Sequence, residues 1–150
     1  MNKTLIIFLF LLLSCGYQPV YLNKDILDLK YSKIILEGDN EINQKIVKTL
    51  SIEENKKNEN LDKLYLSSAY KIETTSKNTK GEAVSFRITV IVDLEIKDIN
   101  DKNIQNKNFN KQFTLNSRQK KFDLAEYQDS VKNDLVNKII SEIIIYLNTK

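Results

Sequence analysis

Hydrophobic and polar residues alternate most regularly between residues 84 and 96 of this chain. An apolar residue occupies every second position, and mostly polar or charged residues stand between them. Alternation with a period of two is typical of a β-strand that buries one face. The apolar series, interrupted only by the additional apolar residue Ile91, is Val84, Phe86, Ile88, Val90, Val92, Leu94 and Ile96. The pattern therefore predicts a long, half-buried strand.

Three shorter segments also have the composition or alternation of strands. Residues 31–37 are rich in isoleucine, residues 64–73 alternate apolar and polar positions, and residues 109–116 do the same. We expect the last of these to pair with the strand at 84–96. The polar segments between the strands are predicted to be one surface connection and two turns, at residues 51–60, 74–82 and 98–107.

The segment after Gly38 is predicted to be the first of two helices. Asp39 is a favourable N-cap, because its carboxylate accepts a hydrogen bond from a first-turn amide that has no partner within the helix. The apolar residues of this segment share one helical face and are Ile42, Ile46, Val47 and Leu50.

The second helix is predicted to begin near Leu124 and to reach the carboxyl terminus. Asp123 and Glu126 have the spacing of a capping box, and Phe122 and Tyr127 stand at hydrophobic-staple positions. At about 1.5 Å per residue this helix would be roughly 35 Å long. Its apolar stripe is Val131, Leu135, Ile139, Ile143 and Leu147, flanked by Val136, Ile140 and Ile144. A stripe of this width is typical of a helix packed on a core.

The order of elements is strand, helix, strand, strand, strand, helix. Helices with one apolar stripe and strands with one apolar face bury these surfaces against each other when both helices cover the same face of a sheet. We therefore predict an α+β fold, a two-layer sandwich with two helices on one face of a four-stranded, mainly antiparallel sheet, whose other face is polar. Residues 31–150 are long enough for one such domain.

The amino-terminal segment has the features of an export signal. An uninterrupted apolar run, Leu5 to Leu13, follows a positively charged amino end. The run is less than half of the roughly 20 residues that a transmembrane helix needs. We therefore expect residues 1–14 to be a signal peptide that is removed.

Cys15 is the only cysteine and directly follows this segment. Its neighbours Ser14 and Gly16 are small, as a lipoprotein signal peptidase requires. We therefore expect Cys15 to carry a diacylglycerol and acyl lipid that holds the protein stably at a membrane, with residues 15–30 as a tether. The alternative is an ordinary secretory peptide that leaves Cys15 as a free thiol.

Composition argues against several classes of function. The chain has no histidine, and its single cysteine is assigned to the anchor, so the usual bases, thiol nucleophiles and nitrogen or sulfur metal ligands are missing. Three glycines cannot form a phosphate-binding loop, and no nucleophile-elbow motif occurs. The net charge of +3 and the scattered lysines do not indicate nucleic acid. We expect a protein that is not an enzyme and has no cofactor besides its lipid.

Residues 15–21, Cys-Gly-Tyr-Gln-Pro-Val-Tyr, resemble the start of lipopolysaccharide-assembly lipoproteins of the LptE (RlpB) family, as found in alphaproteobacteria. That family begins with Cys-Gly-aromatic-x-Pro-x-Tyr, and its element order and long terminal helix are similar. The resemblance implies an outer-membrane lipoprotein on the periplasmic face that plugs the LptD β-barrel and assists the transport of lipopolysaccharide to the cell surface. Gly16 is consistent with sorting to the outer membrane.

Direct contact with lipopolysaccharide phosphates would require cations. The candidate residues are Lys77, Lys80, Arg87, Arg118, Lys120 and Lys121. Ordinary surface solubility is the simpler explanation of these charges, because surface lysine is common and generally solvated. Two other classes of function also stay open: an auxiliary lipid- or solute-binding lipoprotein of an ABC-type transporter, and a lipoprotein inhibitor of a cell-wall enzyme.

Overall fold

The computed structural model describes residues 29–118 and 120–149. The predicted signal peptide and the anchor Cys15 lie outside this part of the chain. The elements in chain order are β1 (Lys30–Tyr31), β2 (Lys33–Gly38), α2 (Asn40–Thr49), β3 (Glu53–Glu54), β4 (Lys63–Lys77), β5 (Ala83–Lys97), β6 (Asn103–Asn116) and α3 (Lys121–Asn148).

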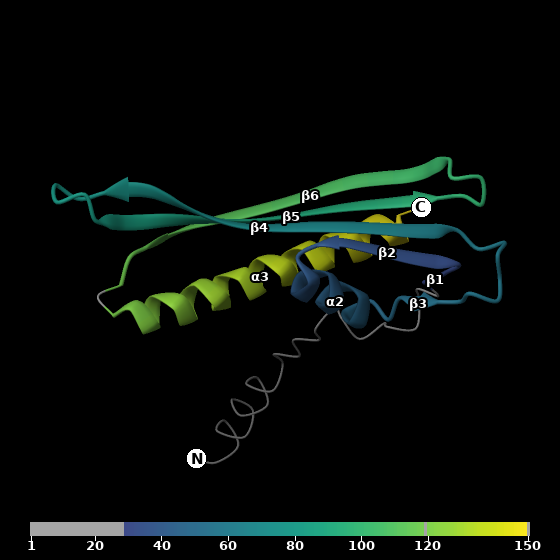
Figure 1. Ribbon diagram of the computed structural model, residues 1–150, viewed down its shortest axis with the longest axis horizontal. Helices are drawn as coiled ribbons and strands as arrows, with labels where there is room; N and C mark the ends of the chain where they lie inside the picture. Colours follow the sequence, from purple (N-terminus) through teal and green to yellow (C-terminus); the bar gives the residue numbers. More distant parts are fainter. Residues whose placement is uncertain (1–28, 119, 150) are drawn as a thin grey trace, which may run out of the picture.

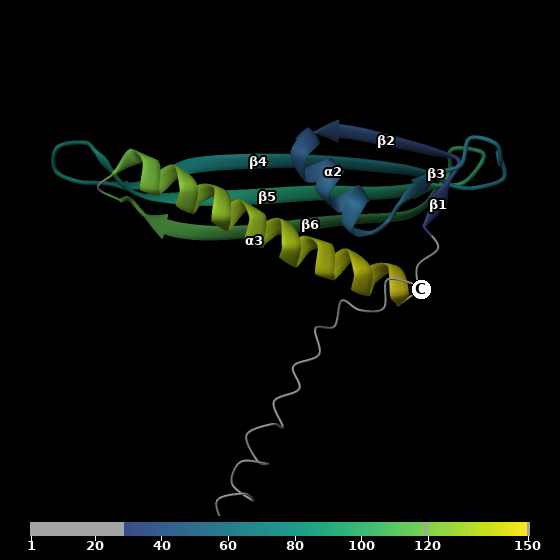
Figure 2. The same ribbon diagram turned by 90° about the horizontal axis from the view of Figure 1, so that it is seen from below.

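The main sheet has the strand order β2-β4-β5-β6. β2 is parallel to β4, whereas β4 with β5 and β5 with β6 are antiparallel hairpin partners. Both helices lie on the same side of this sheet (Figure 1), and the view from that side shows α3 crossing the strands diagonally while α2 lies near β2 and β4 (Figure 2). The predicted α+β two-layer fold is confirmed.

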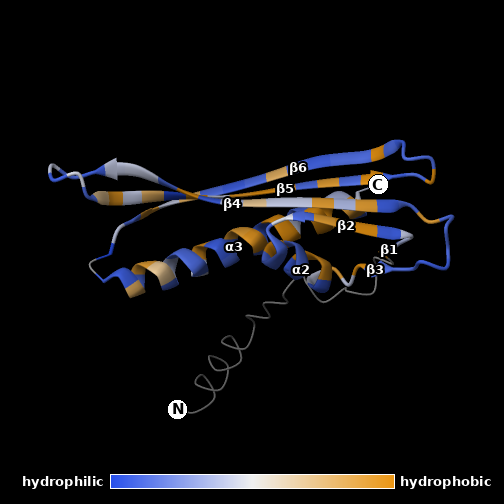
Figure 3. Ribbon diagram, in the orientation of Figure 1, coloured by the Kyte–Doolittle hydropathy of each residue, from blue (hydrophilic) through white to orange (hydrophobic). Residues whose placement is uncertain are grey.

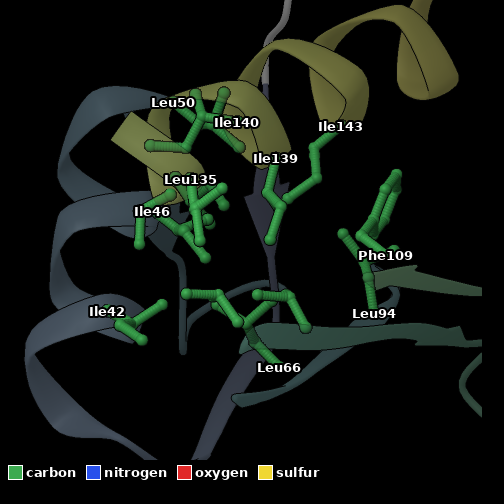
Figure 4. Close-up of a cluster of buried hydrophobic side chains, with 14 of the residues drawn as sticks. Ile42, Ile46, Leu50, Leu66, Leu94, Phe109, Leu135, Ile139, Ile140 and Ile143 are labelled. Carbon is green, nitrogen blue, oxygen red and sulfur yellow. The ribbon is translucent and has the colours of Figure 1, made fainter. Parts of the chain in front are cut away.

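The core forms where the apolar faces of sheet and helices meet. α2 contributes Ile42 and Ile46, both at most 1% exposed, and α3 contributes its apolar stripe. Figure 4 shows these side chains converging on Leu66 and Leu94 of the sheet. The most deeply buried side chains include Leu64, Leu66, Ile88, Val90, Val92, Leu94, Val136, Ile139, Ile140 and Ile143. These are the residues that the period-two and period-four patterns selected.

The two faces of the sheet differ in polarity, and Figure 3 shows apolar and polar residues following one another along β5. Strand register explains the separation, because Leu66 of β4 pairs with Leu94 of β5 while Ser67 pairs with Asp93. Side chains of neighbouring strands in one register row share a face. We call the face without helices the open face. Within the described residues, no helix is long and apolar enough to cross a membrane.

The predicted loops were too long. Residues 51–60 contain β3, which pairs in parallel with β1, and Ile52 beside it is 7% exposed. β4 continues to Lys77, and β6 already begins at Asn103, because backbone pairing with β5 extends beyond the apolar alternation. An antiparallel sheet can expose one face to water, so polar residues are tolerated on the open face of a strand. The polar ends of these strands therefore had the composition of turns.

The predicted start of α3 was wrong. The helix begins at Lys121, its N-cap is Lys120, and the N-cap side chain makes no capping hydrogen bond. Asp123 therefore lies inside the first turn, where its charge still suits the positive end of the helix. Phe122 is 77% exposed and does not form the predicted staple.

The segment at 31–37 also differs from its prediction. It is divided into β1 and β2 at Ser32, whose N–H donates to the carbonyl of Asp62 at 2.9 Å. Leu29 packs against the core and Lys30 already belongs to β1, although both fall in the predicted tether.

Candidate functional site

The turn between β4 and β5 is a compact, hydrogen-bonded structure that carries two candidate lysines. The side-chain oxygen of Asn78 accepts from the backbone N–H groups of Lys80 and Glu82, both at 2.9 Å. Gly81 has a φ of +83°, which a glycine adopts without strain. Lys77 and Lys80 are exposed on this turn and the adjoining strand end.

The connection from β6 to α3 is tied to the start of β5 next to this turn. The N–H of Ser117 donates to the carbonyl of Val84 at 2.8 Å. Arg118 follows directly, and its guanidinium carbon lies 4.1 Å from the ring centroid of Tyr127 on α3. A guanidinium over an aromatic face is held there by a cation–π attraction. Arg118 is therefore positioned close to the β5 end of the turn.

Lys120 and Lys121 continue this basic segment as the N-cap and the first residue of α3. The carbonyl of Lys120 accepts from the N–H of Leu124 at 3.1 Å, which starts the helical bonding. The amino end of a helix carries a partial positive charge that adds to that of the lysines.

The β4–β5 turn and the start of α3 lie at the same end of the molecule in both ribbon views (Figures 1 and 2). Five of the six predicted cations are therefore brought to one end of the fold, although they come from segments about forty residues apart. We call this set the basic end. Its members are Lys77, Lys80, Arg118, Lys120 and Lys121.

Arg87 is separated from the basic end. It lies on the open face of β5, directly opposite Glu73 of β4. Lys71 is 2.8 Å from the same carboxylate. The hydrogen bond from Lys71 and the charges of Lys71 and Arg87 lower the pKa of Glu73 below its usual value. Arg87 thus has an acidic neighbour on a different surface.

Large apolar side chains are exposed on the elements that form the basic end. Phe122 of α3 is 77% exposed, and Ile72 and Val84 of the β4–β5 hairpin are near 40%. A surface that offers cations beside exposed apolar groups suits an amphipathic anion such as a phosphorylated lipid. The sequence predicted that Phe122 packs as a hydrophobic staple. Because α3 begins at Lys121, Phe122 lies in its first turn and is exposed instead.

Two carboxylates of the open face, Asp93 and Glu95, have polar partners on neighbouring residues. A shallow depression of about 110 Å³ is lined by residues that include Glu37, Tyr65, Asp93 and Glu95. The side-chain amide of Asn108 donates to Asp93 at 2.6 Å, and Lys97 lies 3.6 Å from Glu95. Within residues 29–118 and 120–149, no group of three or more acidic or other metal-binding side chains is suited to a metal ion.

The sequence matches no protein-family model and no curated protein. The fold, in contrast, has clear counterparts among solved structures. Rare lipoprotein B from Shewanella oneidensis superposes with a TM-score of 0.59 at 8% identity, over 78% of this chain and 94% of that protein. An uncharacterized lipoprotein B from Nitrosomonas europaea gives a TM-score of 0.53 at 9% identity, over 75% and 79%.

These likenesses extend over about three quarters of this chain. Because the sequence identities are below ten percent, the superpositions show a shared fold alone. The resemblance first seen in residues 15–21 is therefore supported by an independent property of the chain. The domain has the fold of rare lipoprotein B, the RlpB (LptE) lipoprotein.

Proposed function

We propose that this chain is an outer-membrane lipoprotein of the LptE type, anchored through an acylated Cys15 on the periplasmic face. It would occupy the lumen of an LptD-type β-barrel and assist the transfer of lipopolysaccharide to the cell surface. The observation that carries the proposal is the fold of rare lipoprotein B in a domain that follows a lipoprotein-type signal sequence.

The open face of the sheet supports a role as a barrel plug. The wall of a large barrel lumen is polar, so a plug needs a polar outer surface. The open face of β6 supplies a column of amide and hydroxyl side chains: Asn106, Asn108, Asn110, Gln112 and Thr114. The apolar stripe of α3 is turned to the core.

The partner is tested by purifying the full, lipidated chain from membranes with a mild detergent. We expect an outer-membrane barrel in stoichiometric amount. Inner-membrane transporter subunits would instead support the auxiliary transporter role, and a soluble hydrolase would support the inhibitor role. Mass spectrometry of the same sample tests the anchor, because an unmodified thiol at Cys15 or a retained signal peptide would contradict it.

The basic end is the proposed contact for lipopolysaccharide phosphates. The triple variant Lys80→Ala, Lys120→Ala and Lys121→Ala removes three positive charges there. Lys56→Ala, Lys57→Ala and Lys102→Ala are a matched control, because these exposed lysines lie outside the basic end, on the β3–β4 and β5–β6 connections. We expect calorimetric titration with lipopolysaccharide to show weaker binding only for the first triple. Equal affinities would contradict the proposed contact.

The single variant Arg87→Ala separates the two surfaces further. Because Arg87 faces Glu73 on the open face, we expect its removal to change lipopolysaccharide affinity less than removal of Lys80.

A role as an auxiliary lipid- or solute-binding protein would need an enclosed apolar pocket. A depression of about 600 Å³ on the described surface is instead open and lined by polar side chains: Asn40, Glu41, Gln44, Lys45, Lys48 and Thr49.

A further inference from the structure

β6 is a long edge strand. It stands last in the sheet order and covers 14 residues, against about five or six for an average strand. It contains no proline or glycine, and its register with β5 is regular from Gln105 to Asn116. Natural edge strands of this length are usually interrupted by prolines or bulges, or covered, because their unpaired backbone groups attract other strands.

The free backbone groups of β6 can be assigned from the ladder. Ser117 donates to Val84, so the pair 84/117 is hydrogen-bonded. Hydrogen-bonded pairs alternate in an antiparallel ladder, which turns the odd-numbered residues of β6 toward β5. The N–H and C=O groups of the even-numbered residues therefore point outward, among them Asn108, Asn110 and Gln112.

α3 extends past this edge. Figure 2 shows its carboxyl-terminal half lying beyond the outer side of β6. A groove of about 510 Å³ follows the junction, lined by residues of β6 such as Phe109 and Asn110 and by Glu142, Ile145 and Tyr146 of α3. Ile145 is 61% exposed there. The helix layer is thus wider than the sheet on this side, by a partly apolar surface that one more strand would cover.

The charges along β6 indicate what kind of strand fits. β6 contains Lys107 and Lys111 and no acidic residue. Both lysines lie on the helix side, opposite Leu94 and Val90 of β5, and Lys111 is 2.5 Å from Glu142. Pairing two copies of β6 would bring four lysines to one seam. Because Lys111 already pairs with Glu142, a strand with an acidic residue opposite Lys107 is favoured instead.

We propose that β6 is a docking edge for an extended segment of a partner protein, which adds as a fifth strand over the overhanging part of α3. The segment carries an acidic residue opposite Lys107 and an aliphatic residue beside it to cover Ile145. This mode of binding combines backbone pairing with side-chain selection by alternate residues. This contact goes beyond the proposed function. The strands of a closed barrel wall have no free edge to pair with β6, so the segment comes from another part of a partner protein.

The proposal is tested with the full chain in detergent and a synthetic, fluorescently labelled peptide that alternates threonine with glutamate or valine. N-methylation of the peptide amides that face β6 removes their hydrogen bonds, and methylation of the opposite edge is the control. We expect saturable binding of the unmodified and control peptides. Binding to the peptide methylated on the β6 side is expected to be at least about tenfold weaker.

A protein variant tests the same contact from the other side. Asn110→Pro removes an outward N–H, a change that a sheet edge tolerates, and Asn110→Ala retains it. We expect only the proline variant to lose peptide binding, with the circular dichroism of both variants unchanged. If Asn110→Pro alters the fold, slower amide exchange of Asn108 and Gln112 in the native chain on peptide addition provides the same test.

Three results would overturn the proposal. Equal binding of both methylated peptides would show that no strand is added. Unchanged exchange at Asn108 and Gln112 would place the peptide elsewhere. Concentration-dependent dimers that protect β6 would identify a second copy as the occupant. The assay contains no barrel, so its failure leaves the proposed partnership with LptD to be decided by the purification experiment.

Discussion

The ammonium group of Lys132 on α3 lies 2.6 Å from a carboxylate oxygen of Glu41 on α2. Asp39 is 3.7 Å away, and the ring of Tyr70 is 5.0 Å from the same nitrogen. Burial of Lys132 disfavours its charge, but the hydrogen bond to Glu41 and the two carboxylate charges outweigh this and hold the pKa of Lys132 above its usual value. The two helices are therefore joined by a mostly buried cation at their contact.

Removal of Lys132 separates the role of its charge from that of its side-chain stem. The side chain is 11% exposed, whereas that of Glu41 is 68% exposed, so the ion pair itself contributes little. We expect Lys132→Ala to lower the free energy of unfolding by about 1–2 kcal/mol through lost packing. Lys132→Met keeps the stem and is expected to cost less than about 1 kcal/mol. Equal losses in urea unfolding would mean that the charge dominates.

Gly38 and Gly81 offer a matched test of backbone constraint. Both have positive φ, +81° and +83°. A Cβ on Gly38 would lie 1.9 Å from the carbonyl oxygen of Ser68, whereas one on Gly81 would meet nothing within 4 Å. We expect Gly81→Ala to cost about 1 kcal/mol, from backbone strain alone. Gly38→Ala is expected to cost several kcal/mol, or to prevent folding, because β2 and β4 must separate. Similar melting temperatures would contradict this explanation.

The elements that were predicted well are those whose side chains alternate between core and solvent. Ile88 to Ile96 in β5 and Ile42 with Ile46 in α2 occupy the buried positions that their spacing indicated. The pattern is reliable there because burial of one face is what selects apolar residues. The same pattern failed at Val84 and Ile72, which are about 40% exposed because no helix covers the end of the hairpin.

Other features depend on contacts that a local pattern does not contain. β3 exists because Glu53 and Glu54 pair with β1, and nothing in this acidic dipeptide indicates a strand. The capping box at Asp123 and Glu126 was not used, because the helix starts earlier, at Lys121. The convergence of Lys77 and Lys80 with the start of α3 follows from the antiparallel order of β4, β5 and β6, which returns the chain to the same end of the sheet.

The predicted cap of α2 is used, and it can be tested separately. The carboxylate of Asp39 accepts from the N–H of Ile42 at 3.1 Å. Asp39→Ala is expected to lower the free energy of unfolding by about 1 kcal/mol, because one first-turn amide loses its partner. Asp39→Ser, which keeps a capping oxygen, is the control and is expected to recover most of this loss. If serine is as destabilising as alanine, the charge near Lys132 is the main contribution of Asp39.

Tyr31 predicts a specific loss of stability at alkaline pH. Its side chain is in the core, at 6% exposure, and burial together with the charge of Asp62 raises the pKa of Tyr31 from 10 to about 12. The folded state therefore holds this proton more tightly than the unfolded chain does. The resulting stabilisation is complete below pH 10 and is lost as the pH rises toward 12.

The size of this effect can be isolated with Tyr31→Phe, which has no proton to lose. A hundredfold difference in proton affinity corresponds to roughly 2.7 kcal/mol. Most of this, about 2 kcal/mol, is lost between pH 10 and pH 12. We expect the free energy of unfolding of the native chain to fall by about that much more than that of Tyr31→Phe over this interval, in urea titrations at constant ionic strength. The remaining tyrosines and lysines titrate in both proteins and cancel in this comparison. If the two curves of unfolding free energy against pH were parallel, the pKa of Tyr31 would be the same in the folded and unfolded chain, which would contradict the prediction.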